Sequence, residues 1–299
     1  MKLTYLGTAA AEGWPAVFCN CDCCRQAREL GGKNIRTRSQ AIINDDLLLD
    51  LPCDTYAHAL RHRINLSAAK WLLVTHSHTD HFYPAELVLR GSCYAHKMTS
   101  PDLEIYCNEA VRDYFFRAAG HELEDAVACH LRFHIAAPFE TLALGRYRVT
   151  PLPARHMSTE QALIYLIEEG TDSLLYAHDT GRFLPEVYDF LAQRNAPLTA
   201  VSLDCTSGKL ENGELDGHMG LPDAVAVKQR LVELGIADEA TQFYVNHFSH
   251  NGGLLHEELC RRAGAFGMCP SFDGMQVHIS SAAKTTYDPE EAAKQPLGN

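Results

Sequence analysis

Short runs of apolar residues alternate along the chain with stretches in which apolar side chains recur every three or four positions. The first pattern predicts strands and the second predicts helices. We expect strands at residues 3–6, 41–43, 47–49, 71–74, 103–106, 147–149, 162–167, 173–176, 198–203, 242–245 and 275–278. We expect helices at residues 55–63, 84–94, 109–118, 185–193, 221–234 and 254–263. Proline stands at or near three of these helix starts, where its missing N–H costs little: Pro84, Pro185 and Pro222.

The alternation of predicted strands and helices continues through both halves of the chain. This order favours an α/β or mixed α+β layered fold. We expect one domain over residues 1–280. The residues beyond Ser280 become small and polar, so residues 281–299 are predicted to form a loosely ordered tail.

Composition narrows the class of protein. The chain has 299 residues, of which 46% are hydrophobic, and this is ample material for a core. No apolar run is long enough to cross a bilayer, and the first residues do not resemble a signal peptide. We therefore expect a cytoplasmic protein without a membrane partner, in which the 11 cysteines are thiols or metal ligands rather than disulfides. The net charge of −12 argues against broad nucleic-acid binding, but not against a small anionic substrate at a metal site.

One polar segment directly follows the predicted strand at residues 71–74. It reads Thr75-His76-Ser77-His78-Thr79-Asp80-His81 and contains three imidazoles and a carboxylate. These groups suit zinc, manganese or iron. Alternation along an extended chain would place His76, His78 and Asp80 on one side, with His81 turning in from the next element. Four such ligands are too many for one catalytic metal that keeps an open position, so the segment predicts a two-metal site.

The remaining ligands of such a site should also follow strands, because α/β folds place their sites at the carboxyl ends of strands. Three residues meet this condition: His156, Asp179 and His247. A carboxylate such as Asp179 can bridge two cations. A histidine or aspartate at the end of a strand, taken alone, is usually a capping or solvated loop residue.

Together these residues give the chain a resemblance to hydrolases of the metallo-β-lactamase superfamily. The resemblance implies a four-layer αββα sandwich of two ββα-type halves, with the site between two sheet edges. It also implies one metal on His76, His78 and His156 and a second on Asp80, His81 and His247, with Asp179 as the bridge. Asp50, at the end of an early predicted strand, corresponds to a residue that orients the histidine segment without binding metal.

A second cluster of possible ligands is Cys19-Asn20-Cys21-Asp22-Cys23-Cys24. Cys19, Cys21 and Cys24 can converge on one tetrahedral zinc if a fourth ligand comes from elsewhere, and His250 is the best candidate. Such a site would attach the N-terminal segment to the loop after His247. A redox pair and free surface thiols are the alternatives.

The cysteine segment narrows the resemblance to two branches of the superfamily. Gly7 to Pro15 and the cysteines after them resemble both the phosphoribosyl cyclic phosphodiesterase of the carbon–phosphorus lyase pathway and the B protein of pyrroloquinoline quinone biosynthesis. The phosphodiesterase branch is the closer one, because the chain retains all seven dinuclear ligands and His247-Phe248-Ser249-His250 fits its zinc pattern. The motifs Asp179-Thr180, Leu203-Asp204-Cys205 and Phe272-Asp273-Gly274-Met275 also match.

The resemblance implies a metal-dependent phosphodiesterase acting on a small, cyclic, phosphoribosyl-like diester. A hydroxide held between two manganese, zinc or iron ions would attack phosphorus. Asp80 would orient it, and His218 would protonate the leaving oxygen. A thioesterase, a lactonase, an RNA-processing nuclease and a non-hydrolytic protein of quinone synthesis are the alternatives. Residues 93–140 match the family least and should shape the entrance to the substrate site. Their role stays open, as do the natural substrate, the identity of the metals and a possible homodimer.

Overall fold

The computed structural model describes residues 1–91, 93–213 and 216–282. Most of the predicted polar tail, residues 283–299, therefore lies outside the described residues. Within the described part, no helix has both the length and the apolar character that crossing a membrane requires.

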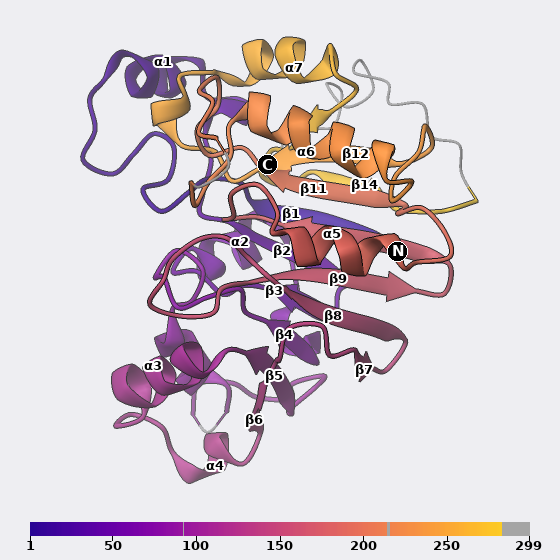
Figure 1. Ribbon diagram of the computed structural model, residues 1–299. Helices are drawn as coiled ribbons and strands as arrows, with labels where there is room; N and C mark the ends of the chain where they lie inside the picture. The colour runs from indigo at the N-terminus through magenta and orange to yellow at the C-terminus, as the bar shows by residue number, and fades with distance from the viewer. Residues whose placement is uncertain (92, 214–215, 283–299) are drawn as a thin grey trace.

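Two seven-stranded sheets form the centre of the molecule (Figure 1). The first has the order β14 (Gln276–His278), β1 (Lys2–Gly7), β2 (Gln40–Ile43), β3 (Leu47–Leu49), β4 (Trp71–Leu73), β5 (Leu103–Cys107) and β6 (Leu131–Ile135). The second has the order β13 (Cys269–Pro270), β12 (Gln242–Asn246), β11 (Ala200–Asp204), β10 (Asp172–Ala177), β9 (Leu163–Glu169), β8 (Tyr147–Pro153) and β7 (Leu142–Leu144).

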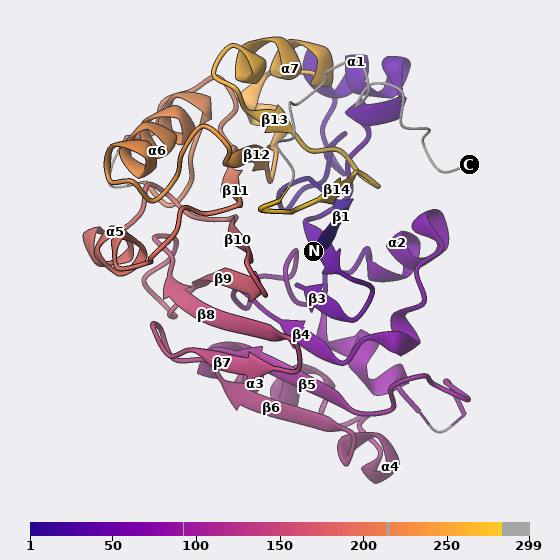
Figure 2. The same ribbon diagram turned by 90° about the vertical axis from the view of Figure 1, so that its right-hand side faces the viewer.

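Helices lie on the outer faces of both sheets, and Figure 2 shows α5 and α6 on one side and α2 on the other. The α-helices are α1 (Asp22–Leu30), α2 (Thr55–His62), α3 (Glu109–Ala119), α4 (Asp125–Ala128), α5 (Pro185–Ala192), α6 (Leu221–Glu233) and α7 (His256–Gly264). The 3₁₀ helices are η1 (Gly32–Asn34), η2 (Leu66–Ala68), η3 (Pro84–Leu89) and η4 (His250–Gly252).

The period-two alternation of the strands produces three hydrophobic layers. Leu3 and Tyr5 of β1 pack against Tyr165 and Tyr176 of the second sheet, in the layer between the sheets. Leu6 points to the opposite face and joins the layer that α3 covers. The outer face of the second sheet packs against α1, α5, α6 and α7. The protein is thus a four-layer αββα sandwich, as predicted.

Several short elements differ from the sequence prediction. β6, β7, β13, α1 and α4 were not predicted, because they are one turn long, lie at sheet edges or carry mostly polar residues. The prediction of a regular helix at residues 84–94 was wrong: the segment is η3, a 3₁₀ helix that ends at Leu89. The other predicted elements are present, with ends shifted by at most a few residues.

Strand direction brings the candidate ligands to one edge. β10, β11 and β12 are mutually parallel, and β8 runs in the same direction as β10 because each is antiparallel to β9. In the first sheet, β3, β4 and β5 are parallel as well. Segments that follow β4, β8, β10 and β12 therefore emerge close together, although they are far apart in the sequence.

Candidate metal centre

The histidine segment leaves β4 at Leu73 and turns rather than continuing as a strand. The backbone N–H groups of His81 and Phe82 both donate to the carbonyl of His78, at 3.0 and 2.8 Å. The expectation that His76, His78 and Asp80 share one side of an extended chain was therefore wrong. The turn divides the segment, so that its first two histidines face one point and Asp80 and His81 face another.

Two groups of potential ligands converge at this edge. His76, His78, His156 and Asp179 form one group, called half-site A here, and Asp80, His81, Asp179 and His247 form the other, called half-site B. In each group the four ligand atoms lie within 4.8 Å of one another. Asp179 belongs to both, and its Oδ2 lies 3.1 Å from the Nε2 atoms of His76 and His81. The structure thus brings together all seven residues that were predicted to form a dinuclear site.

Asp50 holds the histidine segment in place through hydrogen bonds. Its carboxylate accepts hydrogen bonds from the Thr75 backbone N–H at 2.8 Å and from the Thr75 hydroxyl at 3.0 Å. It also accepts from Nδ1 of His81 at 2.7 Å, which leaves His81 Nε2 as the ligand atom. Asp50 is fully buried and belongs to neither half-site. It therefore fixes the orientation of the His81 ring, one of the candidate ligands.

Asp204 and Thr206 give the equivalent support to half-site B from the second sheet. The Thr206 hydroxyl lies 2.8 Å from Nδ1 of His247, and Asp204 Oδ2 lies 3.3 Å from the same atom. Asp204 also accepts from the backbone N–H of Asp179 at 3.0 Å. Asp204 was noted in the sequence only as part of a matching motif. Its position at the end of β11, between the strands that precede Asp179 and His247, could have identified this role.

The side chains of the two half-sites suit divalent cations. Asp179 Oδ1 is buried, and although His218 Nδ1 lies 3.0 Å away, no group among the described residues donates a hydrogen bond to this oxygen with suitable geometry. Ring nitrogens also face one another, with His81 Nε2 3.1 Å from His247 Nε2 and His76 Nε2 2.9 Å from His78 Nδ1. Bound cations would satisfy all of these atoms at once.

The acidic ligands are held as carboxylates. Burial raises the pKa of Asp80, but the neighbouring His81 and a hydrogen bond from His247 outweigh burial and place this pKa well below its usual range. The same balance between burial and adjacent imidazoles lowers the pKa of Asp179. Both side chains are therefore ionised and able to bind metal at any pH near neutrality.

Two ligands occupy a backbone conformation that costs free energy. Asp179 has φ of 55° and His247 has φ of 64°, both in the left-handed region. Each follows a buried strand, and the positive φ turns the chain sharply so that the side chain points into the site. Such strain is typical of functional sites, where the surrounding structure maintains it.

His218 lies beside the dinuclear cluster and is about one third exposed. Its Nδ1 is 3.0 Å from Asp179 Oδ1 and 3.8 Å from Asp204 Oδ2. Burial lowers the pKa of His218, but these two carboxylates outweigh it and raise the pKa to about 11. His218 also falls in a third group of possible ligands with Asp179, Asp204 and His247, so its position fits either a proton donor or a metal ligand.

The structure brings the three candidate cysteines and His250 together, and part of the cluster lies on a helix. Cys24 is in the first turn of α1 and Cys21 precedes that helix. Cys19, Cys21, Cys24 and His250 have ligand atoms within 4.8 Å of one another, and Nδ1 of His250 is 3.5 Å from the Cys21 sulfur. Cys23 is not in the group.

The thiols differ in acidity. A hydrogen bond from the backbone N–H of Cys24 lowers the pKa of Cys21 to about 6, whereas burial raises that of Cys24 to about 12. Close thiolates repel one another, and a zinc ion would stabilise all three in their deprotonated form. This donor set of three sulfurs and one imidazole fits structural zinc.

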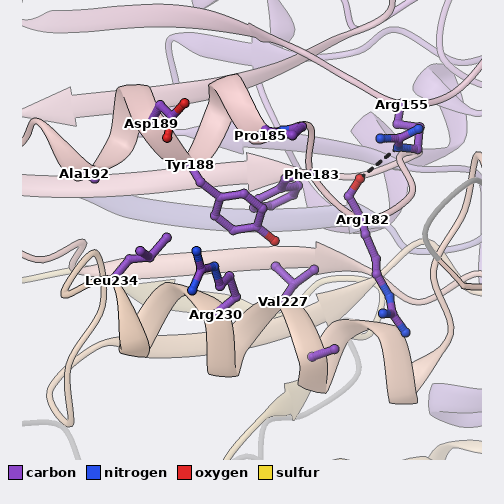
Figure 3. Close-up of a pocket in the computed structure, with 11 residues that line it drawn as sticks. Arg155, Arg182, Phe183, Pro185, Tyr188, Asp189, Ala192, Val227, Arg230 and Leu234 are labelled. Carbon is purple, nitrogen blue, oxygen red and sulfur yellow. Dashed lines mark hydrogen bonds between the residues drawn. The ribbon is translucent and has the colours of Figure 1, made fainter.

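A cleft of about 440 Å³ lies between α5 and α6, on the outer side of the second sheet (Figure 3). Tyr188 and Arg230 approach each other across it from the two helices. At one end, Arg155 Nε donates to the carbonyl of Arg182 at 3.2 Å. The cleft contains none of the half-site residues, so we do not assign the chemistry to it.

The fold and the paired half-sites define a class of protein, and the sequence assigns the chain to a family within it. Residues 47–248 match the family described as the beta-lactamase superfamily domain. This is more than half of the chain, and the protein therefore belongs to that family. It is a hydrolase of the metallo-β-lactamase fold.

Solved structures show the same fold. A diphosphatase from the PhnP family is 22% identical with a TM-score of 0.71, and the match covers 93% of this chain and 98% of that one. Zn²⁺-bound PqqB from Methylobacterium extorquens is 18% identical, also with a TM-score of 0.71, over 93% of this chain and 100% of PqqB. The short form of human tRNase Z is 15% identical with a TM-score of 0.62, over 94% of this chain and 100% of the human protein. No curated protein matches the sequence.

Proposed function

We propose that the protein is a dinuclear metal-dependent phosphodiesterase that acts on a small, cyclic, phosphoribosyl-like diester. The observation that carries the proposal is the pair of half-sites that share the buried carboxylate of Asp179. Two cations held by one bridging carboxylate suit the displacement of an alkoxide from phosphorus, because both the attacking and the leaving oxygen need stabilisation.

His76, His78 and His156 would hold one ion and Asp80, His81 and His247 the other, with Asp179 between them. Manganese, zinc and iron all suit these donors. When bound, the ions lower the pKa of a water molecule and neutralise charge on the phosphate oxygens. Asp80 accepts a hydrogen bond from the attacking water and so orients it. His218 holds a proton beside the site and delivers it to the leaving oxygen.

The net charge of the chain and its structural neighbours both bear on the size and charge of the substrate. The net charge of −12 disfavours a long polyanion such as RNA, although one structural neighbour is a tRNase Z. A diphosphatase of the PhnP family is also a neighbour, and a small phosphate ester fits both observations. Cys19, Cys21, Cys24 and His250 would hold a structural zinc away from the substrate.

The first test is the hydrolysis of bis(p-nitrophenyl) phosphate by manganese-loaded protein. We expect turnover by the wild type and a loss of about 100-fold or more in Asp80→Ala, which removes both a ligand and the group that orients water. If the wild type holds both ions and shows no turnover, the phosphodiesterase proposal is wrong. Thioesters, lactones and a role in quinone synthesis would then be tested next.

The role of His218 is tested by the leaving group. We expect His218→Ala to slow hydrolysis of an alkyl diester by about 100-fold and to affect a nitrophenyl diester much less, because a poor leaving group needs the proton more. The exposed His121 supplies a control variant, His121→Ala. Equal slowing of both substrates would exclude an acid role, and loss of bound metal would instead identify His218 as a ligand.

A further inference from the structure

The loop between β8 and β9, residues 154–162, carries His156 and also a carboxylate, Glu160. The loop is closed at its base, where the Ala154 N–H donates to the Ala162 carbonyl at 2.9 Å. The His156 side of the loop is attached to the second sheet, because the Arg155 N–H donates to the Thr180 hydroxyl at 3.0 Å. Glu160 lies on the other side and faces the first sheet.

Glu160 binds the histidine segment directly. Both of its carboxylate oxygens lie 3.2 Å from the backbone N–H of Ser77, and Oε1 accepts from the Ser77 hydroxyl at 2.5 Å. Ser77 stands between His76 and His78, two ligands of half-site A. Glu160 therefore connects the loop of the third histidine of this half-site, His156, to the segment of the other two.

Asn108 extends the connection to a third segment. Its Nδ2 donates to Glu160 Oε2 at 2.6 Å and to the Gln161 carbonyl at 2.9 Å. Its Oδ1 accepts from the Val111 N–H at 2.9 Å and so caps α3. Asn108 is only 5% exposed. The carboxylate thus has hydrogen-bond donors on both sides, and an uncharged amide would place its own donor against one of them.

Half-site B does not depend on this carboxylate. Asp50 fixes His81, and Thr206 with Asp204 fixes His247. Besides Glu160, the Ser77 segment meets the His156 loop through two imidazoles, where His156 Nε2 lies 3.2 Å from His78 Nδ1. The strand that follows the loop, β9, adds a backbone bond from the Leu163 N–H to the Thr75 carbonyl at 2.9 Å.

We propose that Glu160 is a positioning residue for half-site A: it holds His156 at the distance from His76 and His78 that metal binding requires. The inference rests on the dinuclear site proposed above. It predicts that loss of the carboxylate weakens one of the two metal sites selectively, because the supports of the other are intact.

The test compares Glu160→Gln with Glu168→Gln in the full chain. Glu168 is a matched control, since it is a partly buried glutamate on β9 that pairs with Arg194 at 2.6 Å, away from both half-sites. Manganese is titrated into each metal-free protein, and the two affinities are resolved by chelator competition and by the spin-coupled electron paramagnetic resonance signal of the ion pair. We expect Glu160→Gln to weaken one ion by about 10–100-fold and leave the other unchanged.

Ser77→Ala is a second variant that removes only the hydroxyl contact, so we expect a smaller loss of affinity for the same ion. In the double variant, the fold loss of affinity should be less than the product of the two single losses. Equal weakening of both ions, unchanged affinities, or the same loss in Glu168→Gln would overturn the inference. A wild type that binds no pair of manganese, zinc or iron ions would overturn the proposed dinuclear function itself. The two failures are therefore distinguishable.

Discussion

Alanine in place of Asp179 is expected to release both metals of the dinuclear centre and to abolish hydrolysis. Asp179 contributes an oxygen to each half-site and is 3% exposed. Without it, each half-site keeps three ligands and no bridge, and the imidazoles of His76 and His81 lose a carboxylate 3.1 Å away. Groups that act as one unit lose most of their effect when a single member is removed, so we expect turnover to fall by roughly 10⁴-fold or more.

The measurement is metal content per chain after dialysis, together with kcat on a diester. Asp189→Ala is the control, because Asp189 is an exposed carboxylate on α5 that belongs to neither half-site. The prediction distinguishes Asp179 from Asp80, whose loss should release only the ion of half-site B. If Asp179→Ala retains two ions per chain besides the zinc of the cysteine cluster, Asp179 is not the bridge, and Asp204 becomes the candidate because it lies in the third ligand group.

The seven candidate ligands could be predicted from the sequence because they follow buried strands. Short apolar runs identified β4, β8, β10 and β12, and the last three run in the same direction within the second sheet, so they end at one edge. The position of a ligand relative to its strand is a local property. What pattern alone could not give is how the ligands divide between two ions. That division depends on the turn at His78, which hydrogen bonds create and alternation does not reveal.

The supporting residues were harder to predict for a related reason. Glu160 and Thr206 act through contacts with segments that are distant in sequence, at Ser77 and His247. A glutamate in a loop and a threonine after a strand are common, and neither carries a local signal. Asp50 was identified only through the family resemblance. The sheet edges were missed because β6 and β7 are short and partly exposed, so their pattern is weak.

The cysteine cluster brings the N-terminal segment together with the loop after β12, close to half-site B. His250 lies three residues after His247, and Cys19, Cys21 and Cys24 lie near the N-terminus. The same two regions are also joined by backbone bonds, from Phe248 N–H to the Thr8 carbonyl at 2.9 Å and from Ala10 N–H to the Phe248 carbonyl at 3.0 Å. Loss of zinc should therefore release residues 16–24 before it disturbs His247.

Cys21→Ser is accordingly expected to lower thermal stability strongly while leaving the dinuclear centre occupied. At a zinc concentration 1,000 times the dissociation constant, binding contributes about 4 kcal/mol, which corresponds to roughly 10 °C in the melting temperature. Cys23→Ser is the matched control, because Cys23 lies on α1 two residues after Cys21, outside the ligand group, and its loss should leave the zinc bound.

A fall in pH should lower the thermal stability and the zinc content of the wild type, as Cys21→Ser does. The pKa of Cys21 is lowered to about 6 even without zinc, so its thiolate stabilises the folded state fully at pH values above the usual thiol pKa. This contribution decreases as the pH falls and is lost as the pH passes through 6. Zinc content measured by mass spectrometry and melting curves at pH 8 and pH 5 check both expectations. Equal melting temperatures for Cys21→Ser, Cys23→Ser and the wild type would exclude a structural zinc and leave the two alternatives that the sequence had left open, a redox pair and free thiols.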